Sequence, residues 1–341
     1  MATIKDVAKR AGVSVATVSR VINLSPQTRP DTVESVKSAM KELGYRPNAA
    51  ARTLVSKKSL AIGVVVADVS DPFFGTLVKH VDTMALQQGH HLLIGNGYHK
   101  KEREKQAIES LIQNQVGAFI IHSKALDDDT LLAYAAENEA MVFINRLIPG
   151  LEDRCIHLDN YRGAYLATEH LIQQGHKAIA CISSNHDIED SQQRRRGYLD
   201  ALKAHGLGQH DCSRETLGWI ATGWPDEQGG EDAMLKLLKL LKDSKQITAV
   251  FCYNDVMAAG AITAITDNAY RVPEDISVVG FDDSLIARYL HPKLTTVRYP
   301  IEEMAAQAAE LAISLSNNKQ SLATNGGYKP TLVRRQSVQR V

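Results

Sequence analysis

The sequence predicts an α/β protein that begins with a small all-α part and continues as two doubly wound, parallel-sheet lobes. From residue 60 onward, short apolar runs rich in β-branched residues alternate with amphipathic stretches of helix length. Apolar runs of this kind are typical of parallel strands buried on both faces. The alternation covers about 280 residues, more than one sheet usually holds, so two lobes are expected.

The distribution of charge separates the first part from the rest. The chain of 341 residues has 39 basic and 39 acidic side chains, yet residues 1–58 hold eleven Lys/Arg and only four Asp/Glu. This part therefore carries a formal charge of +7 and the remainder −7. A compact basic segment on an otherwise acidic protein indicates a polyanionic partner, such as DNA.

Several classes of protein are excluded by composition. The hydrophobic fraction of 44% and the charged fraction of 23% are those of a globular domain. The cysteines show neither C-x-x-C nor zinc spacing, so we expect free thiols and neither a metal nor a cofactor; they are Cys155, Cys181, Cys212 and Cys252. The sequence has neither a signal-peptide pattern nor an apolar stretch of about 18 residues, which predicts a cytoplasmic protein without a membrane partner.

Residues 4–23 predict two short helices around a tight turn. Apolar residues recur at helical spacing from Ile4 to Ala11, Gly12 suits the left-handed end of the first helix, and Ser14 suits the N-cap of the second. A third helix is expected at about 31–43. The apolar residues expected to face inward on the second and third helices are Val18, Val21, Ile22, Val33, Val36, Met40 and Leu43.

This arrangement is a helix-turn-helix, whose second helix enters the major groove of double-stranded DNA. Arg20 is long enough to reach guanine O6 and N7, whereas Val15 and Ala16 offer apolar contact to thymine methyl groups. Alternatively, Arg20 contacts a phosphate or remains solvated. The predicted DNA contacts are Ile4, Ser14, Val15, Ala16, Thr17, Ser19, Arg20, Asn23, Tyr45, Asn48 and Leu54.

The segment 46–58 predicts a hinge. From Asn48 the chain has an N-cap residue, three alanines and no helix breaker, but it spans only about two helical turns, which is marginal in isolation. We expect it to order against DNA or a second copy of the chain. Exposed Leu54 is a candidate wedge for a minor-groove base step, or alternatively it packs on the head.

After residue 59 the predicted elements follow in order, with a helix at about 73–88 after the first strand. The predicted strands contain LAIGVVVADV, HLLIGN, AFIIHS, MVFINR, RCIHLD, AIACISS, AVFCYN, SVVGFDD and TTVRYP. Asp, Asn or Ser follows most of them, at the sheet edge where α/β proteins bind ligands. A carboxylate-rich and amide-rich edge suits a neutral, polyhydroxylated ligand; alternatively, these residues cap the following helices.

The chain resembles the LacI family of bacterial repressors over essentially its whole length. The matching motifs are IKDVAKRAGVSVATVSRVIN, GYRPNAAARTL, IGVVV followed by DPFF, QQGH, YNDVMAAGA, VVGFDD and LTTVRYP. The motifs VSDPFFG, LLIGNGYH, FINR, GFDD and TLVRR favour the galactose-responsive members. The resemblance implies a cytoplasmic, nucleoid-associated homodimer that represses a sugar operon and leaves operator DNA when D-galactose or a related hexose binds.

The resemblance also implies the domain boundaries. The head covers residues 1–45, the hinge 46–58 and the core 59–341, with the N-lobe at about 59–160 and 292–322 and the C-lobe at about 161–291 and 323–341. Chain crossings between the lobes are expected near 160, 291 and 323. The implied effector contacts are Phe73, Phe74, Asn145, Arg194, Trp224, Asn254 and Asp282.

Some alternatives remain open at this point. Either Asn145 or its neighbour Arg146 faces the ligand, and the effector is galactose, another hexose, a purine corepressor or a phosphoprotein corepressor. An enzyme is disfavoured because G-x-S-x-G, Walker A and H-E-x-x-H motifs are missing, and most of the twelve histidines are expected at the surface. A periplasmic binding protein is disfavoured by the basic head. Because no leucine heptads follow PTLVRRQSV, we expect a dimer rather than a tetramer.

Overall fold

The computed structural model describes residues 2–22, 28–45, 59–207, 219–241, 247–318 and 326–341. By its internal contacts the chain divides into two compact units, residues 1–60 and 61–341. The predicted hinge 46–58 lies outside the described residues.

The first unit is a bundle of three short helices. They are α1 (Ile4–Ala11), α2 (Val15–Ile22) and α3 (Pro30–Glu42). The hydroxyl of Thr3 accepts a hydrogen bond from the Asp6 N–H while the Asp6 carboxylate accepts one from the Thr3 N–H, a capping box that starts α1. Val7, Val18 and Val36, one from each helix, are fully buried, and each contributes about 1.5–3 kcal/mol by leaving water.

The first sheet of the second unit builds the N-lobe. Its strand order is β11-β5-β4-β3-β1-β2, and all these pairings are parallel. The strands are β1 (Ala61–Val66), β2 (His91–Asn96), β3 (Ala118–Ile121), β4 (Met141–Ile144), β5 (Cys155–Leu158) and β11 (Gly327–Tyr328). The helices are α5 (Pro72–Gln87), α6 (Lys101–Gln113), α7 (Asp128–Glu137), the 3-10 turn η1 (Glu152–Arg154) and α14 (Ile301–Ser316).

The second sheet builds the C-lobe in the order β12-β10-β9-β8-β6-β7, in which only β12 runs antiparallel to its neighbour. The strands are β6 (Ile179–Ser184), β7 (Ile220–Gly223), β8 (Ala249–Cys252), β9 (Ser277–Asp282), β10 (Thr295–Arg298) and β12 (Thr331–Val333). The helices are α8 (Asn160–Gln173), α9 (Glu189–Ala204), α11 (Glu227–Leu241), α12 (Asp255–Asp267) and α13 (Leu285–Tyr289).

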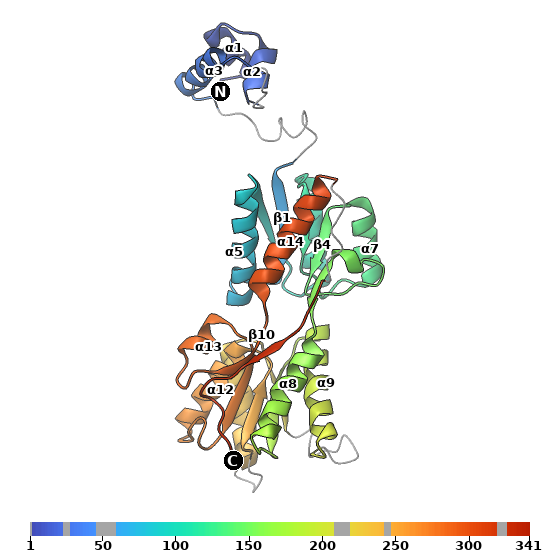
Figure 1. Cartoon of the computed structure of the whole chain (residues 1–341), viewed down its shortest axis with the longest axis vertical. Coiled ribbons are helices and arrows are strands. Elements are labelled where there is room, and N and C mark those ends of the chain that lie inside the picture. Colours follow the sequence, from blue (N-terminus) through green and yellow to red (C-terminus); the bar gives the residue numbers. More distant parts are fainter. Residues whose placement is uncertain (1, 23–27, 46–58, 208–218, 242–246, 319–325) are drawn as a thin grey trace. The chain divides into compact units, whose positions relative to one another are not determined.

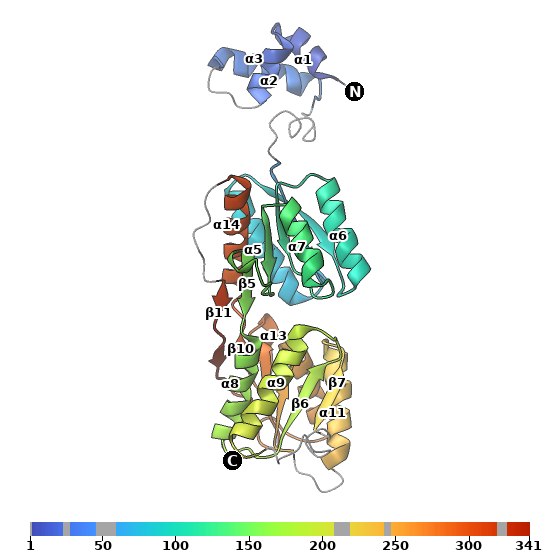
Figure 2. The same cartoon turned by 90° about the vertical axis from the view of Figure 1, so that its right-hand side faces the viewer.

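Alternate residues of each central strand pack on opposite layers of helices, as a doubly wound sheet requires. In β1, Val64 belongs to the core beneath α5 and α14, whereas Val65 belongs to the core beneath α6 and α7. In β8, Phe251 faces the layer of α8 and α9, and Val250 faces α11 and α12. Figure 1 shows α5 and α14 together on one side of the first sheet, and Figure 2 shows α6 and α7 on the side turned toward the viewer. The predicted fold class is confirmed.

The chain passes between the lobes three times, after β5, after β10 and between β11 and β12. The first crossing lies at residue 159, close to the expected 160. The other two positions were wrong, because β10 pairs with β9 in the C-lobe and β11 pairs with β5 in the N-lobe. The second crossing therefore falls between Arg298 and Ile301, and the third follows Tyr328. The sequence predicted β10 as a strand but not the sheet that it joins, and the two residues of β11 are too few to leave a periodic pattern.

Candidate DNA-binding surface and effector pocket

The turn between α1 and α2 has the predicted geometry. Gly12 has a left-handed φ of 67°, and the Val13 N–H donates to the Ala8 carbonyl at 3.0 Å. The Ser14 hydroxyl accepts a hydrogen bond from the Thr17 N–H at 3.1 Å, which satisfies one of the N–H groups left unpaired at the start of a helix. These contacts determine the direction in which α2 leaves the turn.

The two sides of α2 have different roles. Val18 and Val21 are buried in the core of the head, whereas Ala16 and Arg20 are exposed and Val15 exposes 41% of its surface. An outward row of this kind, with one long basic side chain among small ones, fits a major groove. Two further predicted contacts on this helix, Thr17 and Ser19, are half-buried.

Other predicted DNA contacts also support the head. Ile4 and Tyr45 are half-buried and pack against its core. One inward position was wrong: Leu43 is exposed, while Ala39 is buried. The cause is that α3 ends at Glu42, one residue before Leu43. The predicted contacts that lie outside the described residues are Asn23, Asn48 and Leu54.

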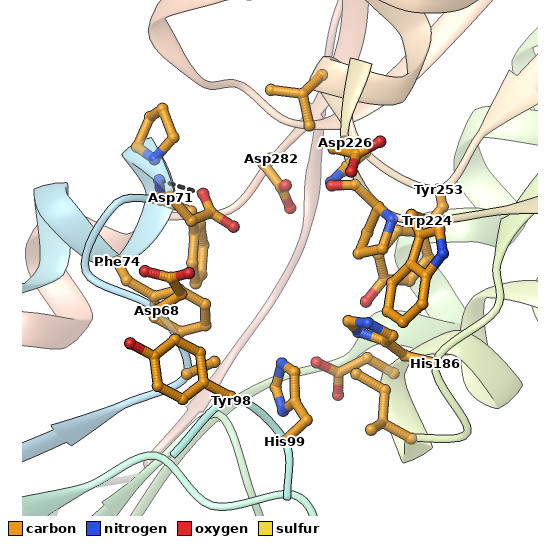
Figure 3. Close-up of a pocket in the computed structure, with 18 of the residues that line it drawn as sticks. Asp68, Asp71, Phe74, Tyr98, His99, His186, Trp224, Asp226, Tyr253 and Asp282 are labelled. Carbon is orange, nitrogen blue, oxygen red and sulfur yellow. Dashed lines mark hydrogen bonds between the residues drawn. The ribbon is translucent and has the colours of Figure 1, made fainter. Parts of the chain in front are cut away.

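Residues of both lobes line a cavity of about 700 Å³ in the second unit. It lies where the strands of both sheets end, at the edge where doubly wound sheets bind ligands. Figure 3 shows Asp68, Asp71 and Tyr98 of the N-lobe opposite Trp224 and Asp226 of the C-lobe. All seven predicted effector contacts line the cavity: Phe73, Phe74, Asn145, Arg194, Trp224, Asn254 and Asp282.

Arg194 is held rigidly in the wall of the cavity. Its Nε donates to Asn160 Oδ1 at 2.8 Å, one terminal nitrogen donates to the Tyr253 carbonyl at 2.7 Å, and the other lies 3.4 Å from Asp282 Oδ1. Its guanidinium also lies 3.7 Å from the centre of the Phe281 ring. Burial opposes its charge, but Asp282, Tyr253, Asp190 and Tyr299 together outweigh burial and raise the pKa of Arg194. The group is therefore a fixed cation.

A buried ion pair joins the two lobes beside the cavity. Lys124 of the N-lobe donates to Asp190 of the C-lobe at 2.7 Å, and their side chains are only 2% and 7% exposed. Asn145 donates to the other oxygen of Asp190 at 2.7 Å, and Asn160 donates at 3.3 Å. Burial raises the pKa of Asp190, but Lys124 and Arg194 outweigh burial and hold it below the ordinary value.

The neighbours Asn145 and Arg146 point to different places. Asn145 lines the cavity and has a left-handed φ of 59°; its Oδ1 is buried without a hydrogen-bond partner among the described residues. Arg146 instead donates to the carbonyls of Ser123 and Leu126 and pairs with Asp128 at 2.6 Å. Of the two alternatives, Asn145 is the one that faces the cavity.

Of the polar residues that follow strands, some cap the next helix, others line the cavity, and Asn254 does both. Asp159 caps α8, accepting a hydrogen bond from the Arg162 N–H at 2.8 Å. Asn254 both caps α12, by accepting from the Met257 N–H at 2.9 Å, and lines the cavity. Asp282 lines the cavity with a left-handed φ of 108°. Non-glycine residues are rarely held in this conformation, and where they are the site is often functional.

Negative charge predominates around the cavity. Six carboxylates line it, against two cationic side chains. Arg194 is paired with Asp282 and Lys124 with Asp190, so four carboxylates remain against Lys100. The carboxylates are those of Asp68, Asp71, Asp190, Asp226, Glu227 and Asp282. A phosphorylated or otherwise anionic ligand would meet repulsion here, whereas hydroxyl groups find many acceptors.

Comparison with known proteins identifies the family. The protein-family model for bacterial regulatory proteins of the lacI family matches residues 3–48, and the family model for a periplasmic binding protein-like domain matches residues 168–338. The HTH-type transcriptional regulator GalR of Escherichia coli (strain K12) is 51% identical over 338 residues, which are 99% of this chain and 96% of that protein. The chain belongs to the LacI family.

Other members of the LacI family agree with this. The HTH-type transcriptional regulator GalS of Salmonella typhimurium is likewise 51% identical, over 99% of this chain and 97% of its own length. The lac repressor dimer bound to operator and an anti-inducer aligns over 99% of both chains with a TM-score of 0.84 and 28% identity. The protein is thus a DNA-binding transcriptional regulator and not an enzyme. No helix among the described residues could span a membrane.

Three histidines in the pocket of this LacI-family protein were not among the residues predicted from the sequence. His99, His122 and His186 all line the cavity. A signal for them existed, because each follows a strand, as the predicted contacts do: His99 follows β2, His122 follows β3 and His186 follows β6. The expectation that most histidines lie at the surface does not hold for His122, His170 and His176, which are buried.

Proposed function

We propose that this protein represses an operon for sugar utilisation and leaves its operator when D-galactose or a related hexose fills the cavity. The observation that carries the proposal is a cavity lined by carboxylates, amides and aromatic rings, in a chain 51% identical to GalR over nearly its whole length. A neutral pyranose matches this chemistry, because its hydroxyls bind polar groups and its C–H face packs on aromatic rings.

Each predicted effector contact has a role in this proposal. The side chains of Asn145, Asn254 and Asp282 exchange hydrogen bonds with ring hydroxyls, and the fixed guanidinium of Arg194 bridges two of them. Trp224, which exposes 61% of its surface, supplies a flat face for the C–H side of the sugar. Phe73 and Phe74, whose rings meet edge to face at 5.2 Å, close the opposite wall.

On the DNA side, we propose that a homodimer places one α2 helix in each of two major grooves of a pseudo-palindromic operator, as a cytoplasmic, nucleoid-associated protein. The dimeric, operator-bound lac repressor among its structural relatives supports this arrangement. Arg20 is the proposed guanine contact. Leu54, outside the described residues, remains a predicted minor-groove wedge.

The test is a fluorescence titration of the natural operator with the full-length protein, with and without D-galactose. We expect operator affinity to fall when galactose is added, and by linkage operator DNA should weaken galactose binding by the same factor. D-Glucose, which differs at one hydroxyl, is the matched control.

Calorimetry against a panel of hexoses and purines then identifies the effector. Tight binding of a purine, with no response to any hexose, would show that the effector is a purine, the alternative left open by the sequence; the operator titration with that purine would then show whether it acts as a corepressor. Unchanged operator affinity in the presence of galactose would reject galactose as the inducer.

A further inference from the structure

Five aromatic rings form a continuous row across the pocket, from one lobe to the other. Their centres are separated by 4.8 Å from Phe74 to His122, 5.6 Å from His122 to His99, 5.3 Å from His99 to His186 and 5.2 Å from His186 to Trp224. His99 and His186 come from opposite lobes and face each other at the lower edge of the pocket in Figure 3. Opening of the lobes would separate them.

The nitrogen atoms of two of these rings are not equivalent. Nδ1 of His99 and Nδ1 of His122 are buried and have no hydrogen-bond partner among the described residues. Both rings nevertheless line the cavity, so Nε2 is the polar atom left to face a ligand. An imidazolium carries N–H donors on both nitrogens, and a donor on this Nδ1 would lack an acceptor. The buried environment therefore favours a neutral ring with its proton on Nε2.

The backbone at His99 has an unfavourable conformation that neighbouring hydrogen bonds hold in place. Tyr98 and His99 both have left-handed φ values, 53° and 51°, although neither is glycine. The turn is held by hydrogen bonds from the Gly97 N–H to the Val66 carbonyl and from the Tyr98 N–H to the Ala67 carbonyl, each 2.8 Å long. Two successive residues in this conformation are unfavourable, and such strain persists mainly at functional sites.

We propose that His99, His122 and His186 form a wall of neutral imidazoles that hydrogen-bonds to the bound hexose from both lobes, so that binding of the effector requires their deprotonated state. This inference rests on the proposed function, because it concerns the same cavity and the same ligand class. It adds three recognition residues and a dependence of effector binding on pH.

The charged groups around the histidines act in both directions. The pKa of His99 is lowered to about 4, chiefly by burial and also by His186 and Lys124, with Asp190 opposing them. Burial also lowers the pKa of His122, with His99 and Lys124 acting in the same direction and Asp190 against it. Burial lowers the pKa of His186, opposed by Asp226. The remaining charged groups that line the cavity are Asp68, Asp71, Lys100, Arg194, Glu227 and Asp282.

The sign of the pH effect follows from these directions. When the lobes separate, water reaches the rings and their pKa returns toward the ordinary 6.5. At the three histidines protons therefore bind the open form more strongly, and acidification opposes closure around the sugar, whereas burial raises the pKa of Asp71 and Asp282, which act in the opposite direction. A single histidine with these two pKa values weakens galactose binding about tenfold between pH 7.5 and pH 5.5, and binding releases protons within this interval.

The experiment is calorimetry of the full-length protein with D-galactose at pH 7.5 and 5.5, in two buffers of different ionisation enthalpy. The wild type should bind about tenfold more weakly at pH 5.5 and release protons at pH 6. His99→Gln, which retains a donor but does not titrate, should keep most of its affinity at pH 7.5 and lose much of the pH dependence. His99→Leu, which has no donor, should bind about tenfold more weakly at pH 7.5.

His205→Gln is the matched control, because this exposed histidine lies at the end of α9, bonded to the Ala201 carbonyl. The galactose affinity of His205→Gln should depend on pH in the same way as that of the wild type. Equal wild-type affinity at both pH values without proton release would overturn the inference, as would an unchanged pH profile in His99→Gln. If a variant fails to fold, the release of protons when the wild type binds galactose decides by itself whether the inference holds. A wild type that binds no hexose at pH 7.5 would overturn the proposed function as well.

Discussion

Replacement of Lys124 by Met tests whether the buried ion pair holds the lobes together around the effector. The substitution keeps the length of the side chain but removes the cation that lies 2.7 Å from Asp190. Removal of one member of a buried pair costs about 3–5 kcal/mol. Because the amides of Asn145 and Asn160 still donate to Asp190, we expect the lower end, about 3 kcal/mol.

Opening of the lobes relieves this cost, because water then reaches the carboxylate. The closed form therefore loses about 3 kcal/mol relative to the open form, which corresponds to galactose binding about a hundredfold weaker. Lys124 acts here as a positioning residue, through Asp190 and Asn145, which line the cavity. Calorimetry measures the change, and urea unfolding of Lys124→Met, Asp190→Asn and the double variant separates loss of the pair from loss of either group.

The pH dependence of this effect has a definite sign. In the wild type the pKa of Asp190 lies below 3.8, so its contribution to stability is present above pH 3.8 and is lost as pH falls through the folded pKa. In Lys124→Met, burial without the cation raises that pKa, and acidification should restore part of the lost stability. Wild-type galactose affinity in Lys124→Met, or a stability deficit that does not shrink between pH 7 and 5, would refute the reasoning.

Substitutions at three further positions test the fold. Val18→Ala removes two methyl groups from a fully buried site in the head and costs about 2 kcal/mol; operator binding should be lost in anisotropy assays while galactose binding is kept, and retained operator binding would contradict this. Gly12→Ala should destabilise the head by about 1 kcal/mol because of its φ of 67° alone, since a Cβ there meets no atom of the described chain within 4 Å. Gly12→Asn should destabilise the head less, and thermal unfolding followed by circular dichroism measures the difference. Tyr198→Phe removes the 2.7 Å hydrogen bond to the buried Ile179 carbonyl, an expected loss of about 1–2 kcal/mol in urea unfolding, whereas an unchanged midpoint would mean that water replaces the hydroxyl.

Much of the fold could be read from local patterns. All nine apolar runs identified in the sequence are strands, and the Gly12 turn, the Ser14 cap and the helix beginning at Pro72 lie where the residues predict them. Three strands were missed: β7, β11 and β12. They are two to four residues long and lie at sheet edges, where pairing with the neighbouring strand rather than side-chain alternation makes the strand.

The pocket was predictable only in part. Residues at strand ends converge because parallel strands share one carboxyl edge, so the seven predicted effector contacts reach one cavity. Their partners lie far away in the chain: Lys124 meets Asp190, 66 positions later. A lysine at the end of a strand gives no local indication of such a partner. The positions of the three pocket histidines after strands indicated this edge of the sheets, but nothing in the sequence indicated their contacts with one another across the lobes.

By itself, the sequence determined the class of the protein: local periodicity, turn residues and the +7 charge of residues 1–58 are properties of neighbouring residues, and they suffice for a helix-turn-helix head and doubly wound lobes. Only the tertiary structure decided which polar groups meet. It turned Asn145 toward the cavity and Arg146 away from it, paired Lys124 with Asp190, and aligned three histidines across the two lobes. The physical reason is that burial and partner choice depend on contacts between distant segments, which form only when both sheets and their crossings are in place.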